Sequence, residues 1–198
     1  MKTQYLQRFE ANLARVDNLI SIYKSIAASS SQHARSTDVL RAAVVFLHAS
    51  EEDYFRSVLS DWLLDKADAK ALKTIALTGS EGRAEKFSLQ DLIPFRMDSV
   101  ESVIKQSIRQ SMDKTSFNSY SEICGWLRQI GITLQGFNSQ EKITNLIMRR
   151  HRIVHEVDLV KSEGSSKTAS VDERTVVAWK NAVVEMIGIV DKQVELWM

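Results

Sequence analysis

The sequence predicts an all-α protein, built as an up-and-down bundle of about five to six helices. Apolar residues recur every three or four positions along most of the chain, which is the period of one helix face. Turn-forming residues are scarce, with 7 Gly and 1 Pro in 198 residues, whereas β-sandwiches and barrels need many more. Because 44% of the residues are hydrophobic and 26% are charged, we expect residues 1–198 to form a single domain with one core.

Three long helices are expected at about 3–28, 37–66 and 171–197. The apolar period of the first includes Leu6, Phe9, Leu13, Val16, Ile20 and Tyr23. That of the second includes Leu40, Val44, Leu47, Tyr54, Val58 and Trp62. That of the third includes Val176, Trp179, Val183, Ile187, Val190 and Val194. No sheet is expected between these helices.

Shorter helices are expected at about 98–112, 119–130 and 139–158, because residue pairs close to the capping-box spacing precede each of them. The pairs are Asp98 with Glu101, Ser119 with Glu122 and Asn138 with Glu141, and Ser170 with Glu173 precedes the last long helix. Residues 78–95 contain two glycines and the single proline and are expected to form a connector. Residues 161–170 are rich in Ser, Gly and Lys and are expected to form an exposed loop.

The charge of the chain is nearly balanced, with 26 Lys and Arg against 25 Asp and Glu. This balance argues against a protein that coats nucleic acid or binds membranes through its overall charge, so a nucleic-acid site would be a local cluster. The single cysteine excludes an intramolecular disulfide and a zinc site built from several cysteines. The first twenty residues lack the apolar core of a signal peptide, and we expect a cytoplasmic protein with no membrane partner.

One segment, residues 146–158, concentrates basic residues within two helical turns. On a helical wheel, Arg150 falls in the middle of an apolar stripe, where a guanidinium is costly unless an anion pairs with it. The stripe is formed by Ile143, Leu146, Ile147, Val154 and Val157. His151 and His155 share a face beside the stripe, with Asp158 adjacent. The wheel directs three other charged residues toward solvent, namely Arg149, Arg152 and Glu156. A purely structural Arg, paired with an internal carboxylate beside two histidines, is the alternative.

The second long helix offers a carboxylate for Arg150. Its wheel places Glu51 on the apolar stripe and Glu52 on a flank, on the side of His48. Either carboxylate is a candidate to meet Arg150 across a helix–helix contact. A surface charge pair between Glu52 and Arg56 is the alternative.

The run Arg149–Arg150–His151–Arg152–Ile153–Val154–His155–Glu156 resembles the signature of HEPN domains, in which Arg, a polar residue and three further residues precede a His. The stretch from Leu40 to Tyr54 is similar to the second helix of one branch, the RiboL-PSP-HEPN type. There an acidic residue just before an aromatic one aligns with Glu52. The resemblance implies a helical bundle in which Arg150 and His155 are catalytic, His151 is a polar site residue and Glu52 contributes from the second helix. Glu51 stands where the family usually has an apolar residue.

The resemblance also implies an activity and partners. HEPN proteins act mostly as metal-independent ribonucleases, often as toxins or in phage defence, so RNA is the expected substrate and neither a metal nor another cofactor is needed. A homodimer would bring two copies of the motif into one composite site, and an antitoxin or defence-system protein is a possible further partner. The expected products carry a 2′,3′-cyclic phosphate and a 5′-hydroxyl.

Three other interpretations remain open at this point. The fold serves other HEPN proteins as a non-catalytic RNA-binding, nucleotide-binding or assembly dimer. His151 and His155 are spaced like the metal-binding histidines of a zinc peptidase helix, although Arg152 occupies the place of its glutamate. A purely structural helical protein is the third alternative.

Overall fold

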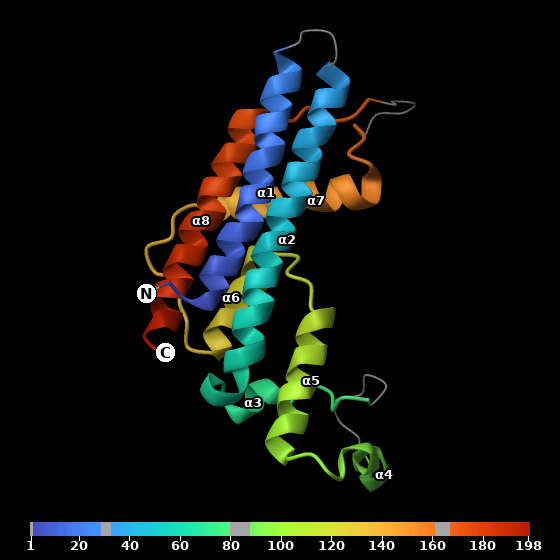
Figure 1. Ribbon diagram of the computed structural model, residues 1–198, viewed down its shortest axis with the longest axis vertical. Helices are drawn as coiled ribbons and strands as arrows, with labels where there is room; N and C mark the ends of the chain where they lie inside the picture. The colour runs from blue at the N-terminus through green and yellow to red at the C-terminus, as the bar shows by residue number, and fades with distance from the viewer. Residues whose placement is uncertain (1, 29–32, 80–87, 161–166) are drawn as a thin grey trace. The chain divides into compact units, whose positions relative to one another are not determined.

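The computed structural model describes residues 2–28, 33–79, 88–160 and 167–198. These residues form α-helices and one short 3-10 helix, and their only strand-like pairing is an isolated antiparallel bridge between Leu159 and Thr168. The elements are α1 (Gln4–Ala27), α2 (His33–Lys66), α3 (Ala69–Leu72), α4 (Leu89–Leu92), η1 (Ile93–Phe95), α5 (Val100–Lys114), α6 (Tyr120–Gln129), α7 (Gln140–Glu156) and α8 (Glu173–Glu195) (Figure 1). The all-α prediction is therefore confirmed.

The helix positions follow the apolar period closely, and five of the six expected helices begin and end within two residues of their expected bounds. The exception is α2, which begins at His33 instead of residue 37. The helix α7 ends at Glu156 instead of residue 158. The expected connector at 78–95 contains α4 and η1, while its residues 80–87 lie outside the described part of the chain. Residues 161–166 of the expected loop also lie outside it.

The chain divides into two compact units, and the first consists of Met1–Tyr54, Asn118–Tyr120 and Leu134–Met198. In this unit α1 lies beside α2 and α8, and α7 runs across them (Figure 1). Pairs along α1 show that it is antiparallel to α8, since Lys180 contacts Asp17 at 2.6 Å and Lys24 contacts Glu173 at 2.8 Å. The side chains buried between these helices are mostly apolar and include Phe9, Val16, Leu40, Val44, Leu47, Ile143, Leu146, Val183 and Ile187.

The second unit consists of Phe55–Phe117 and Ser121–Thr133 and holds the end of α2 with α3 to α6. Its core is also apolar and includes Phe55, Leu59, Leu63, Ile108, Met112, Phe117, Ile123 and Leu127. Arg56 closes the end of α5 by donating from Nε and Nη2 to the Thr115 carbonyl at 3.1 and 2.8 Å. The motif that the sequence singles out lies wholly in the first unit, on α7.

Candidate functional site

The first half of α7 has one buried face, whereas no residue in its second half is buried. Ile143, Leu146 and Ile147 are buried, as the predicted apolar stripe requires. The stripe does not continue, because Val154 is 48% exposed and Val157 is 70% exposed. The basic motif is therefore carried by a stretch of helix at the protein surface, and the prediction that Arg150 lies inside a continuous apolar stripe is wrong.

The chain reverses direction immediately after α7. Val157 and Asp158 both have a positive φ, of 51° and 56°, and both donate their backbone N–H to the Arg152 carbonyl. This left-handed conformation is tolerable for Asp but costly for a β-branched residue such as Val. The Ala169 N–H then donates to the Asp158 carbonyl at 2.8 Å. This hydrogen bond holds the segment around Ala169 against the end of the helix. The turn directs the Asp158 side chain back toward α7.

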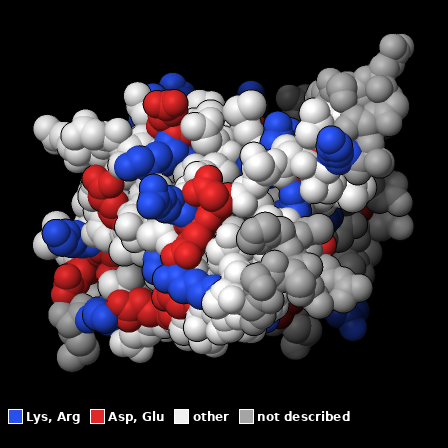
Figure 2. Space-filling view, turned by 90° about the horizontal axis from the view of Figure 1, so that it is seen from above, with Lys and Arg blue, Asp and Glu red and all other residues white. Residues whose placement is uncertain are grey.

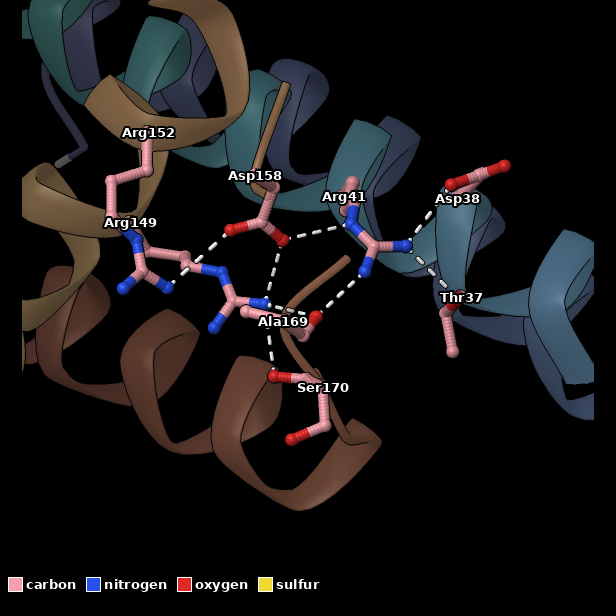
Figure 3. Close-up of polar contacts among 8 residues, drawn as sticks. All are labelled: Thr37, Asp38, Arg41, Arg149, Arg152, Asp158, Ala169 and Ser170. Atoms are coloured by element: carbon pink, nitrogen blue, oxygen red, sulfur yellow. Dashed lines mark hydrogen bonds and ion pairs between the residues drawn. The ribbon is translucent and has the colours of Figure 1, made fainter. Parts of the chain in front are cut away.

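The Asp158 carboxylate is completely buried and collects three arginines (Figure 3). Arg41 donates from Nε at 2.8 Å and Arg149 from Nη2 at 2.7 Å, while Nη2 of Arg152 is more distant, at 3.4 Å. Arg41 and Arg149 also donate to the Ala169 carbonyl, at 2.7 and 2.9 Å. A buried charge is stable only when it is paired and hydrogen-bonded. We call Asp158, Arg41, Arg149 and Arg152 the Asp158 cluster.

The Asp158 cluster corrects two expectations from the helical wheel. The expectation that Arg149 points toward solvent is wrong, because its side chain is only 12% exposed. Asp158 is also not aligned with the two histidines. The wheel continued the helix through residue 158, whereas the left-handed turn moves this carboxylate to the side of Arg149 and Arg152. Burial lowers the pKa of Arg149, although the Asp158 carboxylate acts in the opposite direction.

Sequence reasoning missed the role of Arg41 in this cluster. Arg41 lies on α2, 117 residues before Asp158, and no local pattern relates positions so far apart. Its guanidinium also contacts Thr37 at 2.9 Å and Asp38 at 3.0 Å within α2 (Figure 3). The cluster therefore ties α2 to the end of α7.

A second set of basic side chains on α7 remains open to solvent. His151 and His155 are exposed and Arg150 is partly exposed. The two imidazole rings lie with centroids 4.6 Å apart, so the prediction that they share one helix face is confirmed. Within the described ranges, none of the three forms an ion pair with a carboxylate, and the expected contact of Arg150 with Glu51 or Glu52 is not formed. We call Arg150, His151 and His155 the open set.

The two glutamates of α2 are both buried, at 0% exposure for Glu51 and 6% for Glu52. The wheel prediction that Glu51 is a buried carboxylate is therefore confirmed. Burial, helped by the charge of Glu52, raises the pKa of Glu51 to about 8, and within the described residues neither of its carboxyl oxygens has a hydrogen-bond partner. Oε2 of Glu52 lies 3.7 Å from Nδ1 of His48. His48, Glu51 and Glu52 thus form a buried polar patch on α2.

A model of the RiboL-PSP-HEPN family matches residues 10–196, which is nearly the whole chain and includes both α2 and α7. The chain belongs to the RiboL-PSP-HEPN family. No curated protein and no solved structure matches it. The family assignment agrees with the all-α architecture of this HEPN protein.

The charges of this HEPN protein form no large field of one sign in the view of Figure 2, where basic and acidic side chains are interspersed. This agrees with the net charge of +1. Among residues 2–28, 33–79, 88–160 and 167–198, no three His, Cys, Asp or Glu side chains are grouped as metal ligands. None of the helices in these ranges has the length and apolar character needed to span a bilayer.

Proposed function

We propose that this RiboL-PSP-HEPN protein is a metal-independent endoribonuclease that acts as a homodimer. The observation that carries the proposal is the open set, which presents a guanidinium and two imidazoles on one exposed end of α7. The neighbouring arginines are engaged by Asp158, whereas Arg150 has no carboxylate partner among the described residues. A forked, permanently charged group in this state suits the non-bridging oxygens of a phosphodiester.

The open set supplies the groups that RNA cleavage by the 2′-hydroxyl needs. A base removes the proton from the 2′-oxygen, an acid protonates the departing 5′-oxygen, and a cation stabilises the charge that builds on the phosphate. His155 is the proposed proton carrier because imidazole changes its charge near neutral pH. Arg150 is the proposed cation, and His151 orients the phosphate or shares the proton transfer. The products would be a 2′,3′-cyclic phosphate and a 5′-hydroxyl.

A single copy of the open set serves only one side of the reaction. In an in-line displacement the attacking and leaving oxygens lie on opposite sides of phosphorus. Two imidazole rings 4.6 Å apart lie on the same side of any phosphate that they contact. The second proton-transfer group would therefore come from a second copy of the chain, related by a two-fold axis.

The surface around the open set supports a self-associating interface. Apolar side chains are exposed near the end of α7 and just after it, at Val154 (48%), Val157 (70%), Leu159 (40%) and Val160 (42%). Apolar residues gathered on a small surface region are typical of interaction sites. A second copy placed on this surface would bury them and bring two open sets to one cleft, where the phosphate backbone would bind despite the low net charge.

The family resemblance extends the proposal to Glu52 and to the biological role. Glu52 is buried beside His48 and forms no ion pair with Arg150, so we propose that it supports the site through the position of α2. The activity is that of a cytoplasmic toxin or a phage-defence component, and an antitoxin or another defence-system protein would control it. Such a partner would act by covering the open set.

The test of the proposed activity is cleavage of a labelled single-stranded RNA in the presence of EDTA. The wild-type protein should cleave it, and the products should carry 2′,3′-cyclic phosphate and 5′-hydroxyl ends. The change His155→Ala should lower the rate by at least about 10²-fold, because it removes the proton carrier. RNA binding should persist, because Arg150 remains. Lys142→Ala, an exposed basic change more than three turns before His155 on α7, is the matched control and should cleave normally.

Three results would contradict the ribonuclease proposal. The first is cleavage by His155→Ala at the wild-type rate, and the second is activity that vanishes in EDTA and returns with zinc. RNA binding without cleavage by the wild type would instead support a non-catalytic RNA-binding dimer.

The proposed dimer has a separate test. Light scattering at micromolar concentration should give twice the 22.5 kDa of one chain. Val154→Glu, which places a charge on an exposed part of α7, should produce a folded monomer that no longer cleaves RNA. A monomeric wild type that still cleaves RNA contradicts the composite site.

A further inference from the structure

A pocket of about 260 Å³ opens on α7 beside the open set. Most of its lining comes from successive turns of α7, and one residue, Asn118, comes from the segment that precedes α6. The lining residues are Asn118, Ile147, Met148, Arg150, His151, Arg152 and Glu156. The volume is just below the range of roughly 300–1,000 Å³ that is usual for drug-sized ligands, so the pocket has room for about one nucleotide.

The walls of this pocket differ in chemistry. Ile147 and the exposed Met148 provide an apolar surface, against which the flat face of a base can pack. Arg150 and Arg152 provide positive charge, and Asn118 provides a side-chain amide that both donates and accepts hydrogen bonds. An apolar wall combined with guanidinium groups and an amide is suited to a base with its attached phosphate.

Arg152 is the arginine of the Asp158 cluster that is best able to bind a further anion. Its contact with Asp158, at 3.4 Å, is the longest of the three, and its side chain is 39% exposed. Arg41 and Arg149 hold the same carboxylate at 2.8 and 2.7 Å. Three guanidinium groups therefore share one buried carboxylate and the exposed Asp38. In the pocket lining, Arg150 and Arg152 outnumber the one carboxylate, that of Glu156.

The pocket adjoins the proposed proton carrier without containing it. His151 lines the pocket and His155 does not, while the two rings are 4.6 Å apart. A phosphate held between Arg150 and His155 would thus lie at the edge of the pocket, and the next nucleotide along the strand would reach its interior.

We infer that this pocket is a nucleotide subsite, which binds one unpaired base of the RNA next to the phosphate that is cleaved. The inference rests on the proposed ribonuclease function and specifies its substrate as RNA with an accessible, unstacked base, because a paired base cannot enter a pocket of this kind. Arg152 holds the phosphate of that nucleotide, Met148 packs against the base, and Asn118 contacts the edge of the base and sets the base preference.

The test uses binding, so that it does not depend on cleavage. The four nucleoside 3′-monophosphates and inorganic phosphate are titrated by calorimetry into the His155→Ala protein. We expect one or two nucleotides to bind at least about fivefold more tightly than the others, with Asn118→Ala removing this preference. Met148→Asp should weaken all four by about tenfold, because it removes the apolar wall and repels phosphate. Both positions are exposed, so the variants should fold.

Arg152→Gln should weaken the nucleotides and inorganic phosphate alike, and Lys142→Ala should leave every affinity unchanged. Equal affinities for all four nucleotides that Asn118→Ala and Met148→Asp do not alter would overturn the subsite. A wild type that binds nucleotides in this pattern but does not cleave RNA would leave the subsite standing and reject the ribonuclease. A wild type that cleaves RNA but binds all four nucleotides equally would support the ribonuclease and reject the subsite.

Discussion

Two sets of basic side chains lie on the same two turns of α7 and have opposite surroundings. Arg149 and Arg152 belong to the Asp158 cluster, which is packed against α2 and the returning chain. Arg150 and the two histidines are open to solvent. Neighbouring arginines of identical chemistry are thus divided between a structural and a proposed functional role.

The position of one carboxylate accounts for the difference. A left-handed turn at Val157 and Asp158 ends the helix and places Asp158 on the side of Arg149. Among the described residues, no carboxylate forms an ion pair with Arg150, so its guanidinium is left for an external anion. The position of the backbone turn therefore decides which arginines pair with a buried carboxylate of the same chain.

The largest expected effect on stability comes from removing that carboxylate. Asp158→Asn keeps a residue that tolerates the left-handed conformation but leaves Arg41, Arg149 and Arg152 without a buried counter-charge. We expect the free energy of unfolding to fall by about 3–5 kcal/mol, as for other broken buried ion pairs. Chemical denaturation of both proteins at the same pH measures the difference.

Asp38→Asn is the matched control for this change. Asp38 contacts Arg41 at 3.0 Å, but its side chain is 73% exposed, so its loss should cost less than about 1 kcal/mol. If both changes lower the free energy of unfolding equally, the Asp158 cluster does not have the structural role proposed for it.

Glu51 is a buried carboxylate without a hydrogen-bond partner among the described residues. Its removal should have the opposite effect on stability to the removal of Asp158. Burial raises the pKa of Glu51 in the folded protein to about 8, from 4.5 for an ordinary glutamate. Because the folded pKa is the higher one, its contribution to stability is fully present below pH 4.5 and is lost as the pH rises to about 8. Each pH unit between these values lowers the free energy of unfolding by about 1.36 kcal/mol.

The change Glu51→Gln should remove this loss. We expect the variant to match the wild type near pH 4.5 and to be more stable by about 3 kcal/mol at pH 7, with Glu52 and His48 left in place. Denaturation curves at several pH values test this. A difference that stays constant across this range would show that Glu51 does not titrate as its burial requires.

The smallest expected effect on stability comes from the left-handed turn at Val157. Val157→Gly should relieve the left-handed strain of a β-branched residue and stabilise the protein by about 0.5–1 kcal/mol, after allowing for the flexibility of Gly in the unfolded chain. Val154→Gly, the same change within the helix, should destabilise by about 0.5 kcal/mol. Thermal unfolding of both variants gives the signs, and the same sign for both would argue against strain at Val157.

The sequence predicted the helices well, because each long helix carries an apolar face with the helical period. It also predicted the burial of Glu51 and the shared face of His151 and His155, since both depend only on positions within one continuous helix. These features are local. They do not require knowledge of which helices are neighbours.

The Asp158 cluster was beyond such reasoning. No glycine marks the left-handed turn at Val157, so the helix was expected to continue to residue 158 and to direct Arg149 toward solvent. Arg41 joins the cluster through the tertiary fold, from a helix far away in the sequence. The pocket residue Asn118 likewise reaches α7 only through packing.

The most direct test of the division between the two sets compares Arg150→Ala with Arg149→Ala. For each variant, RNA cleavage by the folded protein and the free energy of unfolding are measured in parallel. We predict that Arg150→Ala lowers cleavage by about 10²-fold or more and changes stability by less than about 0.5 kcal/mol. Arg149→Ala should lower stability by about 2–3 kcal/mol and leave cleavage by the folded protein within severalfold of the wild type. If Arg149→Ala abolishes cleavage without loss of stability, or Arg150→Ala unfolds the protein and spares cleavage, the division is wrong.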